Sequence, residues 1–437
     1  MKFYSHIDTT FILMETFQLT DFKVVLDKKG ARHFVKVSYP LRCGRWNEII
    51  TPEYFYQFNL NGEIKFITGR GRDWPDPSEW LKRTAAGDWV YYSSGGYSGV
   101  FDLLGEHYLP CLSYPSNAIN SRNPFDETSV KLALGSWQKF HPRLTGLKSE
   151  GLPGKLKNFL DRVIQASPQR LELRSQKLHQ IIGGRVTVLP PDTRHVDYEV
   201  IPITVAEGCL YRCGFCRVKS GRGFSARAPE NIKQQIRELK SFYHRDLRNY
   251  NAVFLGQHDA LNAGADLLEF TARLAFQAFD LGRSNLKGAY LFMFGSVDSV
   301  LSAGATLFER LAALPFSTYI NIGLESADPA TLNRLGKAVS PEKVAAAFSR
   351  ILAVNRRYEN IEMTANFLVD EALSDAHFSS FFQLLENRLD RYYSKGAIYF
   401  SPLINGGQPP HPDLKRRFYA LKSRSRLPAF LYLIQRL

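Results

Sequence analysis

Short apolar runs alternate with amphipathic stretches through the second half of the chain, and this alternation predicts the main fold. Six apolar runs are expected as strands: 200–205, 252–255, 289–294, 319–324, 361–367 and 397–400. The amphipathic stretches between them are expected as helices, among them 229–243, 266–279, 306–314 and 375–387. Such runs suit strands buried on both faces. The pattern predicts an α/β fold, either a partial (β/α)6 TIM-like barrel or a doubly wound sheet.

The first part of the chain has a different pattern and predicts an N-terminal α+β accessory domain over residues 1–145. It is rich in aromatic residues, and Asn61-Gly62 separates two strand-like runs, which is a strong hairpin signal. Residues 146–195 are expected as a basic helical connector and 196–405 as the core barrel. Residues 406–437 are expected as a basic helical tail with an apolar end that docks on the body or on a partner.

Composition excludes several classes of protein. The chain has 437 residues, of which 44% are hydrophobic and 22% charged, so it can bury a sizeable core. No apolar run reaches the roughly 18–20 residues of a membrane span, and the N-terminus lacks a signal-peptide layout. We therefore expect a cytoplasmic protein. The net charge is +14, and residues 407–437 contribute seven Lys or Arg against one Asp. This tail either binds RNA or another anionic surface, or caps the barrel as a solvated helix.

Five cysteines, an odd and sparse number, argue against a disulfide framework. Three of them form a C-x3-C-x2-C motif, Cys209, Cys213 and Cys216, in the loop after the first predicted strand. Three thiolates on one loop suit a metal centre. A structural zinc ion needs a fourth ligand, such as His244 or His258, whereas three cysteines on a [4Fe–4S] cluster leave one iron open. Cys43 and Cys111 are expected as ordinary thiols.

This motif, placed after the first strand of a β/α array, resembles the radical S-adenosylmethionine (SAM) superfamily. The resemblance covers roughly residues 196–400. It implies a single [4Fe–4S] cluster on the three cysteines, with SAM bound to the open iron. It also implies reductive cleavage of SAM to a 5′-deoxyadenosyl radical, which abstracts hydrogen from a substrate that the sequence does not name. An electron donor of the flavodoxin or ferredoxin type is the implied partner.

Other segments carry the same resemblance and imply contacts to SAM. Phe215 precedes the third cysteine, where the family packs an apolar residue near the adenine. The second strand ends in Gly256-Gln257-His258-Asp259, which resembles a loop that contacts the SAM amino group, and Gln257 replaces its first acid. Glu325 and Asn366 stand in segments that resemble the fourth and fifth strands of the coproporphyrinogen-dehydrogenase and elongator-subunit branch. The implied SAM contacts are Phe215, Gly256, Gln257, Asp259, Glu325 and Asn366.

Structural interpretations of these residues stay open. Glu325 could pair with a buried Lys or Arg, Asn366 could cap a strand end, and Lys337 is expected as a solvated helix charge. The alternative functions are an RNA-modifying radical SAM enzyme that uses the basic tail, and a non-catalytic scaffold that binds SAM or a metal. The catalytic residues beyond the cofactor contacts are unknown. Too few cysteines remain for a second cluster, and the cobalamin motif Asp-x-His-x-x-Gly is absent.

Overall fold

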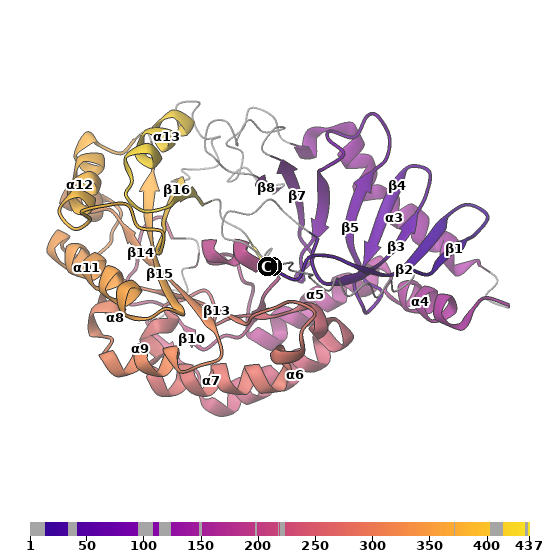
Figure 1. Cartoon of the computed structure of the whole chain (residues 1–437), viewed down its shortest axis with the longest axis horizontal. Helices are drawn as coiled ribbons and strands as arrows, with labels where there is room; N and C mark the ends of the chain where they lie inside the picture. Colours follow the sequence, from indigo (N-terminus) through magenta and orange to yellow (C-terminus); the bar gives the residue numbers. More distant parts are fainter. Residues whose placement is uncertain are drawn as a thin grey trace, which may run out of the picture.

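The computed structural model describes residues 14–33, 42–94, 108–112, 124–147, 151–196, 199–216, 218, 223–370, 372–402, 414–432 and 436–437. These residues form an N-terminal antiparallel sheet with its helices and a C-terminal β/α unit (Figure 1). One hydrophobic cluster runs through both parts, from Phe22 to Leu437, so the two parts share a core. In the described part of the chain, no helix combines the length and the apolar character needed to cross a membrane.

The N-terminal sheet has eight strands that pair in sequence order. They are β1 (Thr16–Gln18), β2 (Lys23–Lys29), β3 (Arg45–Ile50), β4 (Tyr54–Phe58), β5 (Ile64–Gly69), β6 (Trp80–Arg83), β7 (Trp89–Ser94) and β8 (Tyr108–Leu112). The predicted hairpin is β4–β5, with Gln57 opposite Phe66. Gly62 in its turn has φ +81°, a left-handed conformation that costs glycine little.

Three helices accompany this sheet and continue as the connector: α3 (Thr128–Thr145), α4 (Gly154–Gln165) and α5 (Pro168–Ile182). An aromatic cluster joins the sheet to them. The Tyr56 ring stacks on Phe140 at 5.4 Å, and Phe58 meets Trp137 edge-on at 5.3 Å. The connector helices agree with the predicted positions, but the amphipathic pattern of α3 was not recognised from the sequence. The short helix η3 (Pro191–Val196) completes the connector.

The C-terminal unit is built on an all-parallel sheet in the order β17-β16-β15-β14-β13-β12-β9. Its strands are β9 (Ile201–Pro202), β12 (Ala252–Phe254), β13 (Tyr290–Gly295), β14 (Ser317–Glu325), β15 (Ile361–Val369), β16 (Ile398–Pro402) and β17 (Ala429–Leu431). The sheet is open, because β9 and β17 are edge strands. The predicted fold class is thus confirmed, with one strand more than the six expected.

The extra strand comes from the segment expected as a separate tail. Within that segment, α13 (Leu414–Arg424) is helical as expected, but the apolar end forms β17, which pairs in parallel with β16. Phe430 and Tyr432 pack with Tyr399 in a small buried cluster. Leu437 is buried, and its N–H donates to the Val186 carbonyl at 3.3 Å. The chain therefore ends near the middle of the molecule (Figure 1).

Helices follow the strands of this sheet at the predicted places. They are α6 (Pro229–Tyr243), α7 (Ala265–Ala278), α8 (Val297–Ser302), α9 (Ala305–Ala312), α10 (Pro329–Arg334), α11 (Pro341–Arg357) and α12 (Asp375–Glu386), with the short helices η4 (His244–Asn249), η5 (Ala260–Ala263) and η6 (Leu281–Arg283) between them. Asp328 and Ser340 cap α10 and α11, and each side chain accepts a backbone N–H three residues on. In both helices a proline follows the capping residue at the first helical position, so Asp-Pro and Ser-Pro pairs mark the two helix starts in the sequence.

A buried ionic cluster joins the two parts of the molecule. The carboxylate of Glu199, just before β9, lies 2.8 Å from Lys65 and 3.0 Å from Lys82 of the N-terminal sheet. These lysines outweigh the cost of burial and lower the pKa of Glu199 to about 2. Asp246 of η4 accepts hydrogen bonds from Asn59 and from the Leu60 N–H, and its burial raises its pKa to about 7. Polar contacts therefore fix one part against the other.

Candidate functional site

The cysteine loop leaves the sheet at the carboxyl end of its first strand. After β9 the chain enters β10 (Ala206–Glu207), which pairs with β11 (Ser225–Ala226) in a small antiparallel ladder. Arg227 closes the base of the loop, because its side chain pairs with Glu207 and its N–H donates to the Val205 carbonyl at 2.8 Å. The three cysteines lie within this closed loop, at the edge of the sheet where β/α proteins place their chemistry.

Gly214, inside the motif, seats the loop on the end of α10. Its N–H donates to the Leu335 carbonyl at 2.7 Å. A Cβ at this position would lie 3.3 Å from the same carbonyl oxygen, which is a tight contact. Gly336, beside it, has φ +64°, a left-handed conformation that favours glycine. A Cβ added at Gly336 would lie 3.5 Å from the Gly214 nitrogen. Two glycines thus let two backbone segments meet closely next to the thiols.

The three thiols are half-buried or buried and sense one another's charge. Cys213 is buried, while Cys209 and Cys216 are half-buried. The pKa of Cys209 is raised to about 11, mainly by burial and to a smaller extent by charge on Asp259 and on the other two thiols. Burial also raises the pKa of Cys213, although the Lys337 cation opposes this. Among the residues that the structure describes, no three His, Cys, Asp or Glu side chains are arranged to hold a single metal ion.

Asp259 and His258 border the loop and offer polar atoms to it. The Asp259 N–H hydrogen-bonds to the Cys209 sulfur, and its Oδ1 accepts the Ser296 N–H at 3.1 Å. Within the described residues, Asp259 Oδ2 and His258 Nδ1 are buried without a hydrogen-bond partner. Burial raises the pKa of Asp259 and lowers that of His258. Orphaned buried atoms beside three thiols fit a polar group bound there.

Gly256 and Gln257 have different surroundings from those that the resemblance implies. Gly256 has φ +84°, so the backbone turns sharply at the end of β12. The Gln257 side chain is engaged by the connector: its Oε1 accepts the Thr187 N–H at 2.7 Å, and its Nε2 donates to the Arg185 carbonyl at 2.8 Å. The Gln257 side chain therefore fastens the connector to the sheet, and the SAM contact at this position stays a prediction.

Glu325 ends β14 and forms a buried pair with Lys337. Their charged atoms are 3.6 Å apart, and their side chains are 12% and 4% exposed. Lys337 Nζ also donates to the Gly323 carbonyl at 2.5 Å. Burial raises the pKa of Glu325, and Lys337 opposes the rise. Glu325 has φ +67°, an unusual conformation for a non-glycine residue. Lys337 is therefore buried and paired, contrary to the solvated charge expected from the sequence.

Asn366 of β15 belongs to a buried series of side-chain hydrogen bonds. Its Nδ2 donates to Asn321 Oδ1 at 2.7 Å, and Asn321 Nδ2 lies 3.2 Å from Asn366 Oδ1. Asn321 also donates to Thr364 Oγ1 at 2.8 Å, and Thr364 donates to Asp192 of the connector at 3.1 Å. All four residues are buried. The sequence did not reveal this chain, because Asp192 comes from a segment with no motif.

Phe215 packs on apolar residues at the carboxyl end of β15, in a cluster with Leu335, Leu368 and Leu373. Asp259 and Glu325 lie close enough to Cys209 and Cys213 to shift the pKa of their thiols, while the side chains of Gln257 and Asn366 are held by other protein groups. The SAM contacts of all these residues stay predictions. Tyr211 was missed by sequence reasoning. It hydrogen-bonds to Asp298 at 2.7 Å and lies under Lys337 Nζ, 5.5 Å from the ring centre. Its place inside the motif was the available signal.

One family model matches the part of the chain that contains this site. Residues 203–384 match the model described as the Radical SAM superfamily. The match runs from the end of β9 through most of α12, so it contains the three cysteines and every predicted SAM contact. This match gives the chain a radical SAM domain over residues 203–384, and enzymes of that superfamily use a [4Fe–4S] cluster and SAM. The resemblance to one branch of the superfamily stays a prediction.

Solved structures of radical SAM enzymes show a weak likeness. A radical SAM methyltransferase from Sphaerobacter thermophilus is 17% identical, with 70% of this chain and 93% of that chain covered and a TM-score of 0.37. The cobalamin-dependent SAM radical enzyme OxsB is 16% identical, with 50% and 29% covered and a TM-score of 0.33. Methylornithine synthase is 11% identical, with 67% and 81% covered and a TM-score of 0.33. The chain spans less than a third of OxsB, and no curated protein matches it.

Proposed function

We propose that the protein is a single-cluster radical SAM enzyme that cleaves SAM reductively and abstracts hydrogen from a substrate. Cys209, Cys213 and Cys216 would hold three irons of the cluster. The observation that carries the proposal is the position of the three-cysteine loop, at the carboxyl end of the first parallel strand and inside the radical SAM match of residues 203–384.

The residues around the loop suit this role. When held by Cys209, Cys213 and Cys216, the cluster would supply the one electron that splits SAM into methionine and the 5′-deoxyadenosyl radical, which would take a hydrogen atom from the substrate. The raised pKa values of Cys209 and Cys213 mean that the thiols hold protons until a metal displaces them. Lys337 favours the Cys213 thiolate through its charge. Phe215 offers an apolar surface, and Asp259 offers a buried carboxylate oxygen, for the bound SAM.

Aromatic and polar side chains form neighbouring layers on one face of the sheet. Tyr290, Phe292 and Tyr319 form a layer of rings across β13 and β14, with Phe292 stacked on Tyr319 at 5.4 Å. Asn321, two residues after Tyr319, hydrogen-bonds to Asn366 in the polar layer. Phe292, Asn321 and Asn366 are buried, and we propose that these layers help to keep water away from a reactive radical.

The reaction needs an electron donor, and we propose a small flavodoxin or ferredoxin. Cys43, Cys209, Cys213 and Cys216 are free thiols, which suits a reducing compartment such as the cytoplasm.

Anaerobic reconstitution with iron and sulfide tests the proposal. We expect a brown protein with about four irons that produces 5′-deoxyadenosine from SAM under dithionite. C209S, C213S and C216S should each lose the cluster and the cleavage. C43S is the matched control, because Cys43 is a thiol of the N-terminal sheet region, far along the chain from the motif. A colourless protein that holds one zinc ion, or an unchanged iron content in all three variants, would overturn the proposal.

A further inference from the structure

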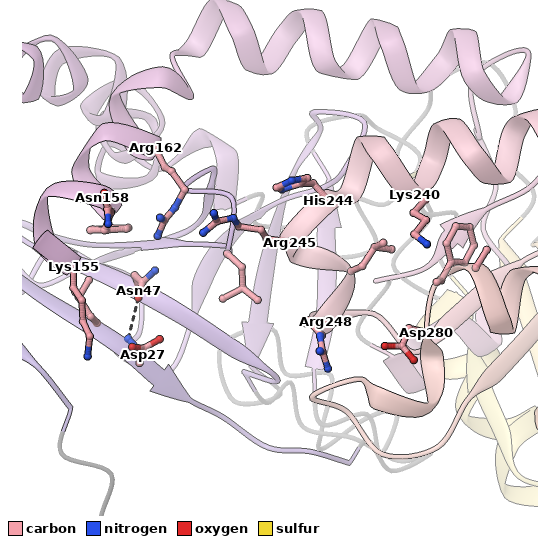
Figure 2. A pocket seen from close by; sticks show the side chains of 16 residues that line it. Asp27, Asn47, Lys155, Asn158, Arg162, Lys240, His244, Arg245, Arg248 and Asp280 are labelled. Carbon is pink, nitrogen blue, oxygen red and sulfur yellow. Dashed lines mark hydrogen bonds between the residues drawn. The ribbon is translucent and has the colours of Figure 1, made fainter.

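A basic pocket lies between the N-terminal sheet and the C-terminal unit. It has a volume of about 670 Å³ and is walled by β2, β3 and α4 on one side and by the ends of α6 and α7 with η4 on the other (Figure 2). Six basic side chains line it: Lys155, Arg162, Lys240, His244, Arg245 and Arg248. The acidic side chains of the lining are Asp27 and Asp280. Five Lys and Arg residues therefore face two carboxylates.

The pocket is separate from the cysteine loop. In a β/α array the helices run back against the strands, so the last turn of α6 and η4 lie at the amino ends of the strands. Lys240 belongs to that last turn, and Arg245 and Arg248 belong to η4. The cysteine loop follows the first strand at its carboxyl end. The two sites thus lie at opposite edges of the sheet, and His244, a candidate zinc ligand, lies at the edge without the cysteines.

Several of these cations have no partner within the described part of the chain. Lys240, Arg162 and Arg245 make no side-chain hydrogen bond or ion pair with these residues, and Arg162 Nε is buried without an acceptor. Arg162 and Arg245 repel each other, which together with burial lowers the pKa of Arg162. Figure 2 shows both guanidinium groups directed into the same space. Elsewhere on the surface, arginines such as Arg310 pair with carboxylates.

We propose that this pocket binds a ligand that carries two or more phosphate groups. Guanidinium forks match phosphate oxygens in pairs, and lysines add point charge. The cations stand on both walls of the pocket, Lys155 and Arg162 on α4 and Lys240, Arg245 and Arg248 on α6 and η4, so a diphosphate or longer anion would lie between them and relieve their repulsion. The volume lies in the range of small-ligand pockets, roughly 300–1,000 Å³. The shared chemistry is a run of phosphates, whether from a nucleotide or from the backbone of RNA.

Calorimetric titration of the full chain with inorganic pyrophosphate, ATP and an unfractionated tRNA pool tests the proposal. The pocket variant is K240Q/R245Q, in which both substituted side chains are exposed. The matched control is K233Q/R237Q, which removes one Lys and one Arg from exposed positions of α6 outside the pocket lining. We expect 1:1 binding of pyrophosphate that weakens at least about tenfold in the pocket variant and little in the control.

The other outcomes are equally decisive. Binding of pyrophosphate or ATP supports a nucleotide-sized ligand. Binding of tRNA alone supports a nucleic-acid backbone as the ligand. In that case the slope of log K against log salt concentration should become shallower by about two in the pocket variant and stay the same in the control. No binding by any of the three probes, or equal weakening in both variants, overturns the proposal. Iron content and SAM cleavage should be unchanged in K240Q/R245Q, so failure of this site and failure of the proposed enzyme activity are distinguishable.

Discussion

The substitution Lys337→Met tests whether the buried pair with Glu325 stabilises the edge of the sheet that holds the cysteine loop. Methionine keeps an unbranched apolar side chain, so the main change is loss of the ammonium group. The substitution removes the donor to the Gly323 carbonyl and leaves Glu325 buried without its cation. Both side chains are almost fully covered, so water cannot replace the lost partner.

The expected cost follows from the separation of the charges. Two unit charges 3.6 Å apart attract each other by about 4.6 kcal/mol at an effective dielectric constant of about 20. Part of this attraction only offsets the cost of removing both charges from water. Removing one partner of such a buried pair costs about 3–5 kcal/mol. We expect Lys337→Met to lower the free energy of unfolding by about 3 kcal/mol, at the low end of that range.

A double-mutant cycle in urea, followed by far-UV circular dichroism, measures this coupling. Glu325→Gln alone should lower the free energy of unfolding less than Lys337→Met, because Lys337 keeps its hydrogen bond to the Gly323 carbonyl. The double variant should be more stable than the sum of the two single losses by about 2 kcal/mol. Additive losses, or a loss below about 1 kcal/mol in Lys337→Met, would refute the reasoning.

The pH dependence of Lys337→Met gives an independent check of the same pair. Lys337 opposes the rise in the pKa of Glu325 that burial causes, so this pKa should rise further in the variant. A carboxyl group whose pKa is higher in the folded state than in the unfolded state loses stability as pH increases between those two values. The loss of unfolding free energy in Lys337→Met should therefore be smaller at pH 5 than at pH 8. A loss of the same size at both pH values would mean that Lys337 does not control the pKa of Glu325.

Three further predictions concern other parts of the molecule. Asp246 has a pKa of about 7, so the free energy of unfolding of the wild type should fall by about 1.4 kcal/mol from pH 6 to 8. Asp246→Asn should lack this pH dependence in urea unfolding, and the same pH dependence in both proteins would contradict the raised pKa of Asp246. Gly62→Ala should lower the melting temperature, because its Cβ would come within 2.9 Å of the α4 backbone at φ +81°, whereas the control Gly154→Ala meets nothing within 4 Å. Asn366→Leu should cost about 1–3 kcal/mol in unfolding free energy, because its buried amide partner loses a hydrogen bond, and a neutral effect would mean that the pair contributes nothing.

Local signals in the sequence predicted the helix starts and the cysteine loop. The Asp328-Pro329 and Ser340-Pro341 pairs place N-caps correctly, because a cap depends on contacts within three residues. The C-x3-C-x2-C spacing places three thiols on one loop for the same reason. The apolar end of the tail was different. Leu427–Ile434 is compatible with a docked segment or a strand, and only pairing with β16 decides between them.

Local patterns in the sequence were enough to predict the fold class and the loop that carries Cys209, Cys213 and Cys216. Tertiary structure decided which polar residues have neighbours distant in the sequence. Gln257 accepts a hydrogen bond from Thr187, and Lys337 pairs with Glu325 on the other side of α10. The basic pocket likewise joins α4 to η4, which lie about 80 positions apart. Spacing reveals contacts within a few residues, whereas contacts across domains depend on packing that no local pattern encodes.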